Sequence, residues 1–213
     1  MANAGYFPGP ERRRQILVGA KKVFATRGYH DTNISHICDD LGIARGTLYQ
    51  YFDSKKAVFL AIVEDLLERV RAAVAAECRV EVPHGAKLTR EQVIQYTAQS
   101  LRRILGAAFE DEASLRILVR EAVGLDVQVD AVLRAIDEIV IDRFASDLAI
   151  AQRAGVLRAD VDARLAALFV VGGIQKLALD ALARQGGPID LDALSLEAAR
   201  IQMAGLLSKE VKK

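Results

Sequence analysis

Apolar residues recur every three or four positions along most of the chain, which is the spacing of one face of an α-helix. The pattern predicts helices over about 10–27, 34–41, 44–52, 54–76, 89–105, 113–123, 126–154, 161–183 and 191–207. No alternating apolar and polar run of useful length is present, so no β-strand is predicted. The pattern therefore favours an all-α fold.

Glycine and capping residues mark several of the predicted helix ends. Gly28, Gly42 and Gly155 each stop an apolar run, as glycine does at helix C-termini. Thr89 followed by Gln92 has the spacing of a capping box, in which each side chain accepts a hydrogen bond from the other residue's backbone N–H. These signals give the predicted boundaries a physical basis.

The segment before the last helix differs from the others because its apolar residues lie on almost all sides: "LAALFVVGGIQKLALDALA", residues 165–183. A helix that is apolar all round is buried all round. In a small domain, a second copy of the chain is one way to cover both sides, and Gly172 and Gly173 would let a neighbouring backbone come close. We therefore predict contacts between copies in this region.

Three short helices open the chain, and the tight turn "LGIA" joins the second to the third. This is the layout of a helix-turn-helix, whose second helix enters the DNA major groove. On a helical wheel with Leu48 pointing inward, polar residues and one glycine occupy the outward face and its two flanks. These residues are Arg45, Gly46, Thr47, Tyr49 and Gln50.

The chemistry of this face suits a DNA duplex. Gly46 has no side chain, so the helix backbone can approach a surface closely. Arg45 can bind guanine or phosphate, and Gln50 can bind adenine or phosphate. Thr47 and Tyr49 can contact a thymine methyl group or a phosphate oxygen. The alternative is an ordinary solvated helix face.

A second anion site is predicted where the fourth helix begins, after a cap at Asp53 or Ser54. Lys55 and Lys56 lie in its first turn, where cations are disfavoured, so we expect a DNA phosphate to compensate them. The free backbone N–H groups of that turn would bind the same phosphate.

Further candidates for phosphate contact lie before the second helix, after the third and in the N-terminal arm: Thr32, Asn33, Tyr51, Arg12, Arg13 and Arg14. Thr32 and Asn33 can also cap the second helix. Tyr51 lies at the edge of the helix face and can also belong partly to the core. The three arginines are equally consistent with a solvated helix face.

Charge and composition agree with this picture. The chain has 213 residues, 52% of them apolar, and a net charge of +1, but residues 1–60 carry nine basic against five acidic side chains. A basic N-terminal part indicates a polyanionic partner. Cys38 and Cys78 are the only cysteines, and neither pairs in a CxxC pattern. With no signal pattern and no apolar run of about 20 residues, we expect a cytoplasmic protein.

No pattern of catalytic chemistry is found. The three histidines, His30, His36 and His84, never fall at metal-ligand spacing. No catalytic triad, paired carboxylates or glycine-rich phosphate loop is recognisable. We expect a protein that is not an enzyme, with no cofactor and no metal.

The N-terminal segment, from Glu11 to Phe59, resembles the DNA-binding domain of the TetR family of transcriptional regulators. The landmarks that carry the resemblance are Ala20, Phe24, Gly28, Thr32, Ile34, Ile37, Gly42, Gly46, Leu48, Tyr49, Tyr51, Phe52 and Lys55. Cys38 stands where the family usually has alanine, and Gln50 where a histidine is frequent. The resemblance covers about the first 60 residues; beyond them only the helical layout is similar.

The resemblance implies a homodimeric, all-helical, one-component transcriptional repressor. A DNA-binding domain over residues 1–56 would bind a palindromic operator. A second domain, residues 57–213, would hold a small, often apolar ligand and dimerise through the last two helices, about 161–207. Ligand binding would tilt the long helix that begins near Ser54 and so change the spacing of the two DNA-binding heads.

The ligand site itself is weakly marked. Any pocket is expected among the helices of about 62–150, where Tyr96 and Arg120 flank apolar stripes and are the candidates for contact with a ligand. Three alternatives stay open: an all-helical enzyme or carrier whose head is only structural, a regulator that senses a protein partner, and a regulator that senses nothing. Repression or activation depends on where the operator lies.

Overall fold

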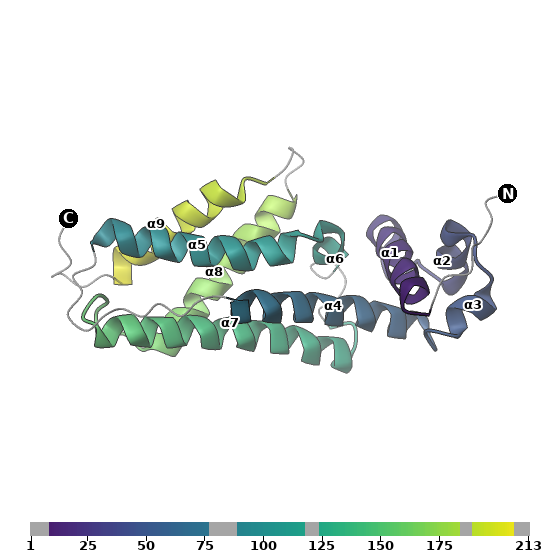
Figure 1. Ribbon diagram of the computed structural model, residues 1–213, viewed down its shortest axis with the longest axis horizontal. Helices are drawn as coiled ribbons and strands as arrows, with labels where there is room; N and C mark the ends of the chain where they lie inside the picture. Colours follow the sequence, from purple (N-terminus) through teal and green to yellow (C-terminus); the bar gives the residue numbers. More distant parts are fainter. Residues whose placement is uncertain (1–8, 77–88, 118–123, 184–188, 207–213) are drawn as a thin grey trace. The chain divides into compact units, whose positions relative to one another are not determined.

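The computed structural model describes residues 9–76, 89–117, 124–183 and 189–206. These residues form α-helices and connecting turns, with no strand among them (Figure 1). The helices are α1 (Gly9–Arg27), α2 (Ile34–Leu41), α3 (Arg45–Tyr49), α4 (Lys55–Ala76), α5 (Arg90–Phe109), α6 (Glu112–Ile117), α7 (Val127–Arg153), α8 (Ala163–Ala183) and α9 (Leu191–Leu206). The predicted all-α fold is confirmed. The second half of the helix expected over 113–123 lies outside the described residues.

Contacts within the chain divide it into two compact units. The first comprises Met1–Glu68 and Asp111–Arg134, and the second comprises Arg69–Glu110 and Ala135–Lys213. Helices α4 and α7 contribute residues to both units. The division of function predicted between residues 56 and 57 stays a prediction.

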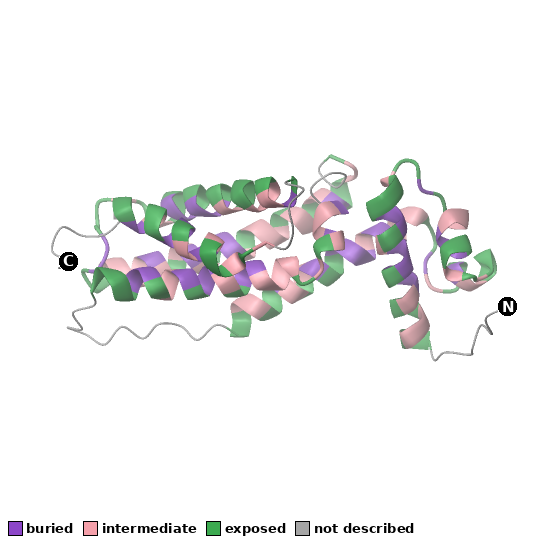
Figure 2. Cartoon of the chain, turned by 90° about the horizontal axis from the view of Figure 1, so that it is seen from above, coloured by how far each residue is buried: buried purple, intermediate pink, exposed green. Residues whose placement is uncertain are grey.

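The core of the first unit is built where apolar stripes of α1, α2, α3 and α4 meet. Ile16, Ile37, Leu48 and Phe59 are fully buried there. The Phe24 ring packs edge-on against Phe59, with centroids 5.6 Å apart. Each such side chain stabilises the fold by about 1.5–3 kcal/mol. The same helices carry exposed residues on their other sides (Figure 2).

An ion pair joins α1 to the start of α6 within the first unit. Lys21 Nζ lies 2.5 Å from Asp111 Oδ2 and 3.1 Å from Asp65 Oδ2. Asp111 also caps α6, because it accepts hydrogen bonds from the backbone N–H and the hydroxyl of Ser114. Burial alone would raise the pKa of Asp111, but the hydrogen bonds from Lys21 and Ser114 lower it below its ordinary value. The ionised carboxylate therefore holds two helices together.

In the second unit, α5 packs along α9 (Figure 1). Leu101 on α5 and Ala199 on α9 are fully buried, and Arg102 Nε donates to Asp192 Oδ1 at 3.0 Å. The predicted capping box of α5 is confirmed: the Thr89 hydroxyl accepts from the Gln92 N–H at 3.2 Å, and Gln92 Oε1 accepts from the Thr89 N–H at 2.8 Å. This cap fixes where α5 begins.

Helix α8 buries only one side within a single chain. Ala166, Ala167, Val170, Val171 and Leu182 are buried, so a single chain covers one side of α8, and the predicted cover of the other side by a second copy stays a prediction. The other side exposes a set of large apolar residues: Leu165 (66% exposed), Leu168 (45%), Phe169 (83%) and Leu177 (40%). By length and composition alone α8 could cross a membrane, but 33% of its most apolar stretch is buried in the chain, and core helices of soluble proteins pass the same test.

Candidate nucleic-acid interface and ligand cavity

The turn between α2 and α3 has the geometry that its glycine predicts. Gly42 adopts a left-handed conformation, with φ of 63°, and closes the C-terminus of α2. The Ile43 N–H then donates to the Cys38 carbonyl at 3.0 Å. Left-handed backbone is easily reached by glycine and costs other residues energy, so Gly42 sets the direction in which α3 leaves the turn.

Helix α3 is fixed to the core on one side and open on the other. Leu48 is fully buried. The opposite side is exposed at Arg45, Gly46, Tyr49 and Gln50, with Tyr49 50% exposed. A Cβ added at Gly46 would meet nothing within 4 Å. The structure therefore brings four of the predicted DNA-contacting residues onto one open face, while Thr47 and Tyr51 are half-buried at its edges.

Thr32 and Asn33 differ in what they offer a DNA backbone. Thr32 is buried, and its hydroxyl donates to the Gly28 carbonyl at 2.7 Å. Asn33 is exposed and caps α2 by accepting from the His36 N–H at 3.0 Å. His36 returns the contact, because its Nδ1 accepts from the Asn33 N–H at 3.3 Å. Asn33, and not Thr32, is thus the cap, and both phosphate contacts stay predictions.

The two lysines at the start of α4 find partners within the chain. Lys55 Nζ donates to the Tyr29 carbonyl at 2.6 Å and lies 4.1 Å from the centre of the Tyr29 ring. Lys56 Nζ lies 2.8 Å from Asp126 Oδ2. Burial lowers the pKa of Lys55. Lys56 therefore has an acidic partner within the chain and Lys55 a carbonyl partner, so neither ammonium group needs an external phosphate to be bonded, and a phosphate contact by Lys55 stays a prediction.

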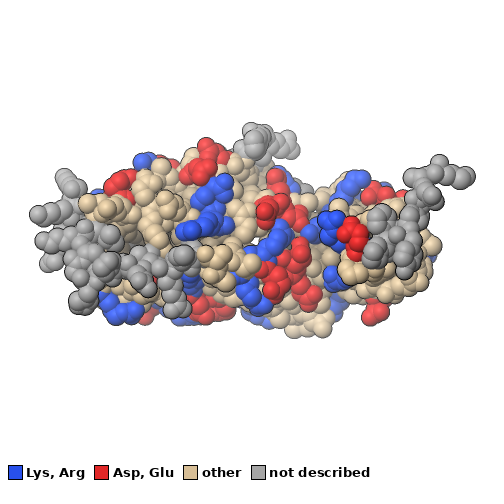
Figure 3. Space-filling model, viewed as in Figure 1, with Lys and Arg blue, Asp and Glu red and all other residues tan. Residues whose placement is uncertain are grey.

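Other basic residues of the first unit are also engaged. Arg14 pairs with Glu11 at 2.8 Å, Arg12 donates to Gln15 at 3.1 Å, and the Arg13 guanidinium lies 5.1 Å from the centre of the Phe52 ring. On the face of the molecule in Figure 3, basic and acidic side chains are interspersed and form no patch of one sign. The basic excess of residues 1–60 is therefore not gathered on that face.

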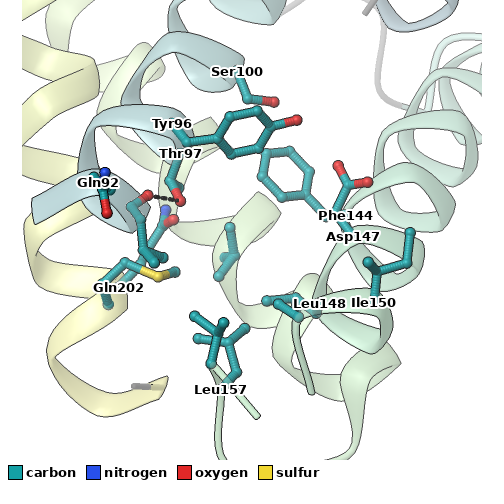
Figure 4. Close-up of a pocket in the computed structure, with 15 residues that line it drawn as sticks. Gln92, Tyr96, Thr97, Ser100, Phe144, Asp147, Leu148, Ile150, Leu157 and Gln202 are labelled. Carbon is teal, nitrogen blue, oxygen red and sulfur yellow. Dashed lines mark hydrogen bonds between the residues drawn. The ribbon is translucent and has the colours of Figure 1, made fainter. Parts of the chain in front are cut away.

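The second unit contains a cavity of about 300 Å³. Four helices and the turn that follows Gly155 supply its walls (Figure 4). Most of the lining is apolar, from Val93, Phe144, Leu148, Ile150, Ala151, Val156, Leu157, Val170 and Met203. The polar lining residues are Gln92, Tyr96, Thr97, Ser100, Asp147 and Gln202. A concave apolar space with a few polar groups is typical of a site for a small molecule.

The polar groups of the cavity are bonded to different degrees. The Thr97 hydroxyl donates to the Val93 carbonyl of its own helix at 2.9 Å (Figure 4). Asp147 Oδ2 accepts from Arg143 Nε at 2.8 Å. Gln202 Oε1 is buried and accepts no hydrogen bond from the described residues. One acceptor in the cavity wall thus remains available.

Comparisons with known proteins give the chain's family. Residues 16–62 match the family described as "Bacterial regulatory proteins, tetR family". The chain is 32% identical over 155 residues to the HTH-type transcriptional repressor AcnR of Corynebacterium diphtheriae, a match that covers 65% of this chain and 81% of that relative. The chain belongs to the TetR family of transcriptional regulators.

Other similar proteins carry different descriptions. The HTH-type transcriptional activator FasR of Mycolicibacterium smegmatis is 28% identical over 120 residues, which cover 54% of this chain and 55% of FasR, so the match spans about half the length of that relative. A solved complex of SmeT with triclosan is 21% identical, covers 95% of each chain and superposes with a TM-score of 0.68. The similar proteins thus include both a repressor and an activator by name.

Within this TetR-family chain, the structure corrects the expected position of the cavity. Tyr96 lines it, whereas Arg120 lies outside the described residues. The lining was expected within residues 62–150, but Leu157, Val170 and Gln202 extend it into the following turn, α8 and α9. The reason is that α9 packs along α5. In the sequence, the polar residue Gln202 among apolar residues was the signal that could have indicated this part of the cavity lining.

Proposed function

We propose that this TetR-family chain is a one-component transcriptional repressor. It binds a palindromic operator as a homodimer and is released by a small hydrophobic ligand. The observation that carries the DNA-binding part is the open face of α3, where Arg45, Tyr49 and Gln50 surround the bare backbone of Gly46. Such a face can lie close to base edges in the major groove.

The exposed apolar side of α8 supports the homodimer. Leu165 and Phe169 lie one helical turn apart and are 66% and 83% exposed in a single chain. Gly172, a further turn along the same side, leaves open space in which a second backbone can approach. Burying this side against a second copy, together with α9, removes apolar area from water. A dimer would place two α3 helices in successive major grooves, about 34 Å apart.

The cavity of the second unit supports control by a ligand. Its size is near the lower end of the roughly 300–1,000 Å³ of known ligand sites, and its walls are mostly apolar. Helix α4 contributes residues to both units, so a ligand that changes its tilt would change the spacing of the two DNA-binding heads. A coupling of about 1–3 kcal/mol is sufficient for induction. We place the regulator in the cytoplasm, where its DNA is.

Operator binding by point variants tests the proposal. Arg45→Ala and Tyr49→Ala should weaken binding to a selected operator at least tenfold while leaving the circular dichroism spectrum unchanged. Arg153→Ala, which alters an exposed arginine at the end of α7, is the matched control and should bind as the unaltered chain does. Affinity should also fall steeply with salt, because released counterions drive phosphate binding. Unchanged binding by both α3 variants, or a flat salt response, would contradict the proposal.

A further inference from the structure

The walls of the cavity limit the size and polarity of what it can hold. Phe144, Leu148 and Val170 are buried and present apolar surface to a volume of about 300 Å³. Tyr96 from α5 and Phe144 from α7 both project into this space (Figure 4). An apolar wall favours an apolar ligand, because both surfaces leave water on binding. A cavity of this volume has no room for a ligand that would place a large polar group inside it.

One hydrogen-bond acceptor in the wall is available to a ligand. Gln202 Oε1 is buried and accepts nothing from the described residues. The Thr97 hydroxyl, by contrast, is already used within its own helix. Buried polar atoms in folded proteins nearly always have a partner, and an unmet acceptor is unfavourable. A ligand with a hydrogen-bond donor can satisfy this atom.

The charges around the cavity argue against an anionic ligand. Among the described residues that line it, none is a lysine, arginine or histidine, and the charged member is Asp147. A ligand carboxylate would lose its water and face the Asp147 carboxylate with no cation in the lining to compensate it. Arg143 lies 2.8 Å from Asp147, so the negative charge is already balanced and a cationic ligand gains little.

We infer that the cavity takes a small, neutral, largely apolar molecule that carries a hydrogen-bond donor, such as an alcohol or a phenol, and that the donor binds Gln202 Oε1. This inference rests on the proposed ligand-controlled function and specifies the chemistry of its ligand.

Three probes of matched size test the inference by calorimetry on the full-length protein at pH 7.5. They are 1-octanol, which has a donor, methyl heptyl ether, which is an isomer without one, and octanoate, which is anionic. Octanol should bind at least tenfold more tightly than either of the other two. Octanoate or ether binding as tightly as octanol, or no binding by any of the three, would overturn the inference.

Variants at Gln202 test whether this residue accepts the hydrogen bond from the ligand's donor. Gln202→Leu removes the acceptor and keeps an apolar wall, so octanol and the ether should bind it within about twofold of each other. Gln99→Leu, a change of the same kind at an exposed position of α5, should keep the full preference for octanol. If Gln202→Leu does not fold by circular dichroism, Gln202→Met replaces it. A preference for octanol that survives loss of the Gln202 amide would refute the assignment.

Operator release, measured separately by fluorescence anisotropy, distinguishes this inference from the proposed function. Tight octanol binding with no release from the operator would contradict ligand-controlled repression and support the cavity chemistry. Release by octanoate but not by octanol would support ligand control and overturn the cavity chemistry.

Discussion

Replacing Gly46, at the centre of the α3 face, with alanine should make the fold more stable and operator binding weaker. A Cβ built at this position meets nothing within 4 Å, and Gly46 lies in a helix with ordinary backbone geometry. Alanine is favoured over glycine in helices by about 1 kcal/mol, partly because it restricts the unfolded chain. For a chain of this length, Gly46→Ala should therefore raise the melting temperature by about 2–4 °C.

The same methyl group should weaken operator binding. It would stand on the face shared by Arg45, Tyr49 and Gln50, where the bare backbone allows close approach to the duplex. Moving the helix away from the base edges lengthens every contact on that face. We expect at least a tenfold loss of operator affinity, which corresponds to about 1.4 kcal/mol.

Two assays and one control decide this prediction. Calorimetry gives the melting temperature, and fluorescence anisotropy with a labelled operator gives the affinity. Gly106→Ala on α5 is the control, because its added Cβ meets only the end of the Arg102 side chain, at 2.9 Å. The control should leave DNA binding unchanged. Wild-type operator affinity in Gly46→Ala would refute the reasoning about the α3 face.

Further predictions concern stability and assembly. Lys21→Met should cost about 1–3 kcal/mol of folding free energy in chemical denaturation, since it leaves the part-buried Asp111 without its ammonium partner. Because the folded-state pKa of Asp111 is lowered, its ionised carboxylate stabilises the folded chain at pH values above the ordinary pKa of 3.8, and this stability is lost as the pH falls through the folded-state pKa. Lys21→Met should therefore lose less folding free energy than the unaltered chain does on acidification. Asn33→Ala should destabilise the chain by about 1 kcal/mol through loss of the α2 cap. Phe169→Asp should weaken dimerisation at least tenfold in sedimentation experiments.

Each of these has an outcome that would count against it. If Lys21→Met lost as much folding free energy on acidification as the unaltered chain does, the pair with Asp111 would not be linked to stability. Full stability of Asn33→Ala would mean that the cap contributes nothing measurable. A Phe169→Asp protein that sediments as the unaltered chain does would exclude this side of α8 from the dimer.

The helix-turn-helix could be predicted because its geometry is encoded locally. The left-handed turn needs only Gly42, the α2 cap needs only Asn33, and the inward side of α3 follows from the spacing of Leu48 relative to the turn. All these signals act within about 20 residues of one another. The boundaries of α1, α2, α4, α7 and α9 were predicted closely for the same reason, whereas α5 runs to Phe109, about four residues beyond its predicted end.

The cavity and the lysine partners could not be predicted because they depend on packing between distant segments. Gln202 reaches the cavity only because α9 lies along α5. Lys55 donates to the Tyr29 carbonyl, 26 positions earlier in the chain, and the periodicity of the sequence does not reveal such a contact. Which side of α8 the chain itself buries was not predicted either, since composition alone does not tell which residues of an apolar helix a single chain covers.

Selection of bound sequences from random double-stranded DNA, with the full-length chain and its Arg45→Ala variant, tests the central claim most directly. A dimer that reads DNA with two α3 helices should select an inverted repeat whose half-sites are centred about one helical turn, or a multiple of it, apart. Arg45→Ala should relax the base preference at one symmetric position of each half-site. No enriched sequence, or an enriched sequence that is identical for the two proteins, would contradict the claim that this face of α3 reads DNA.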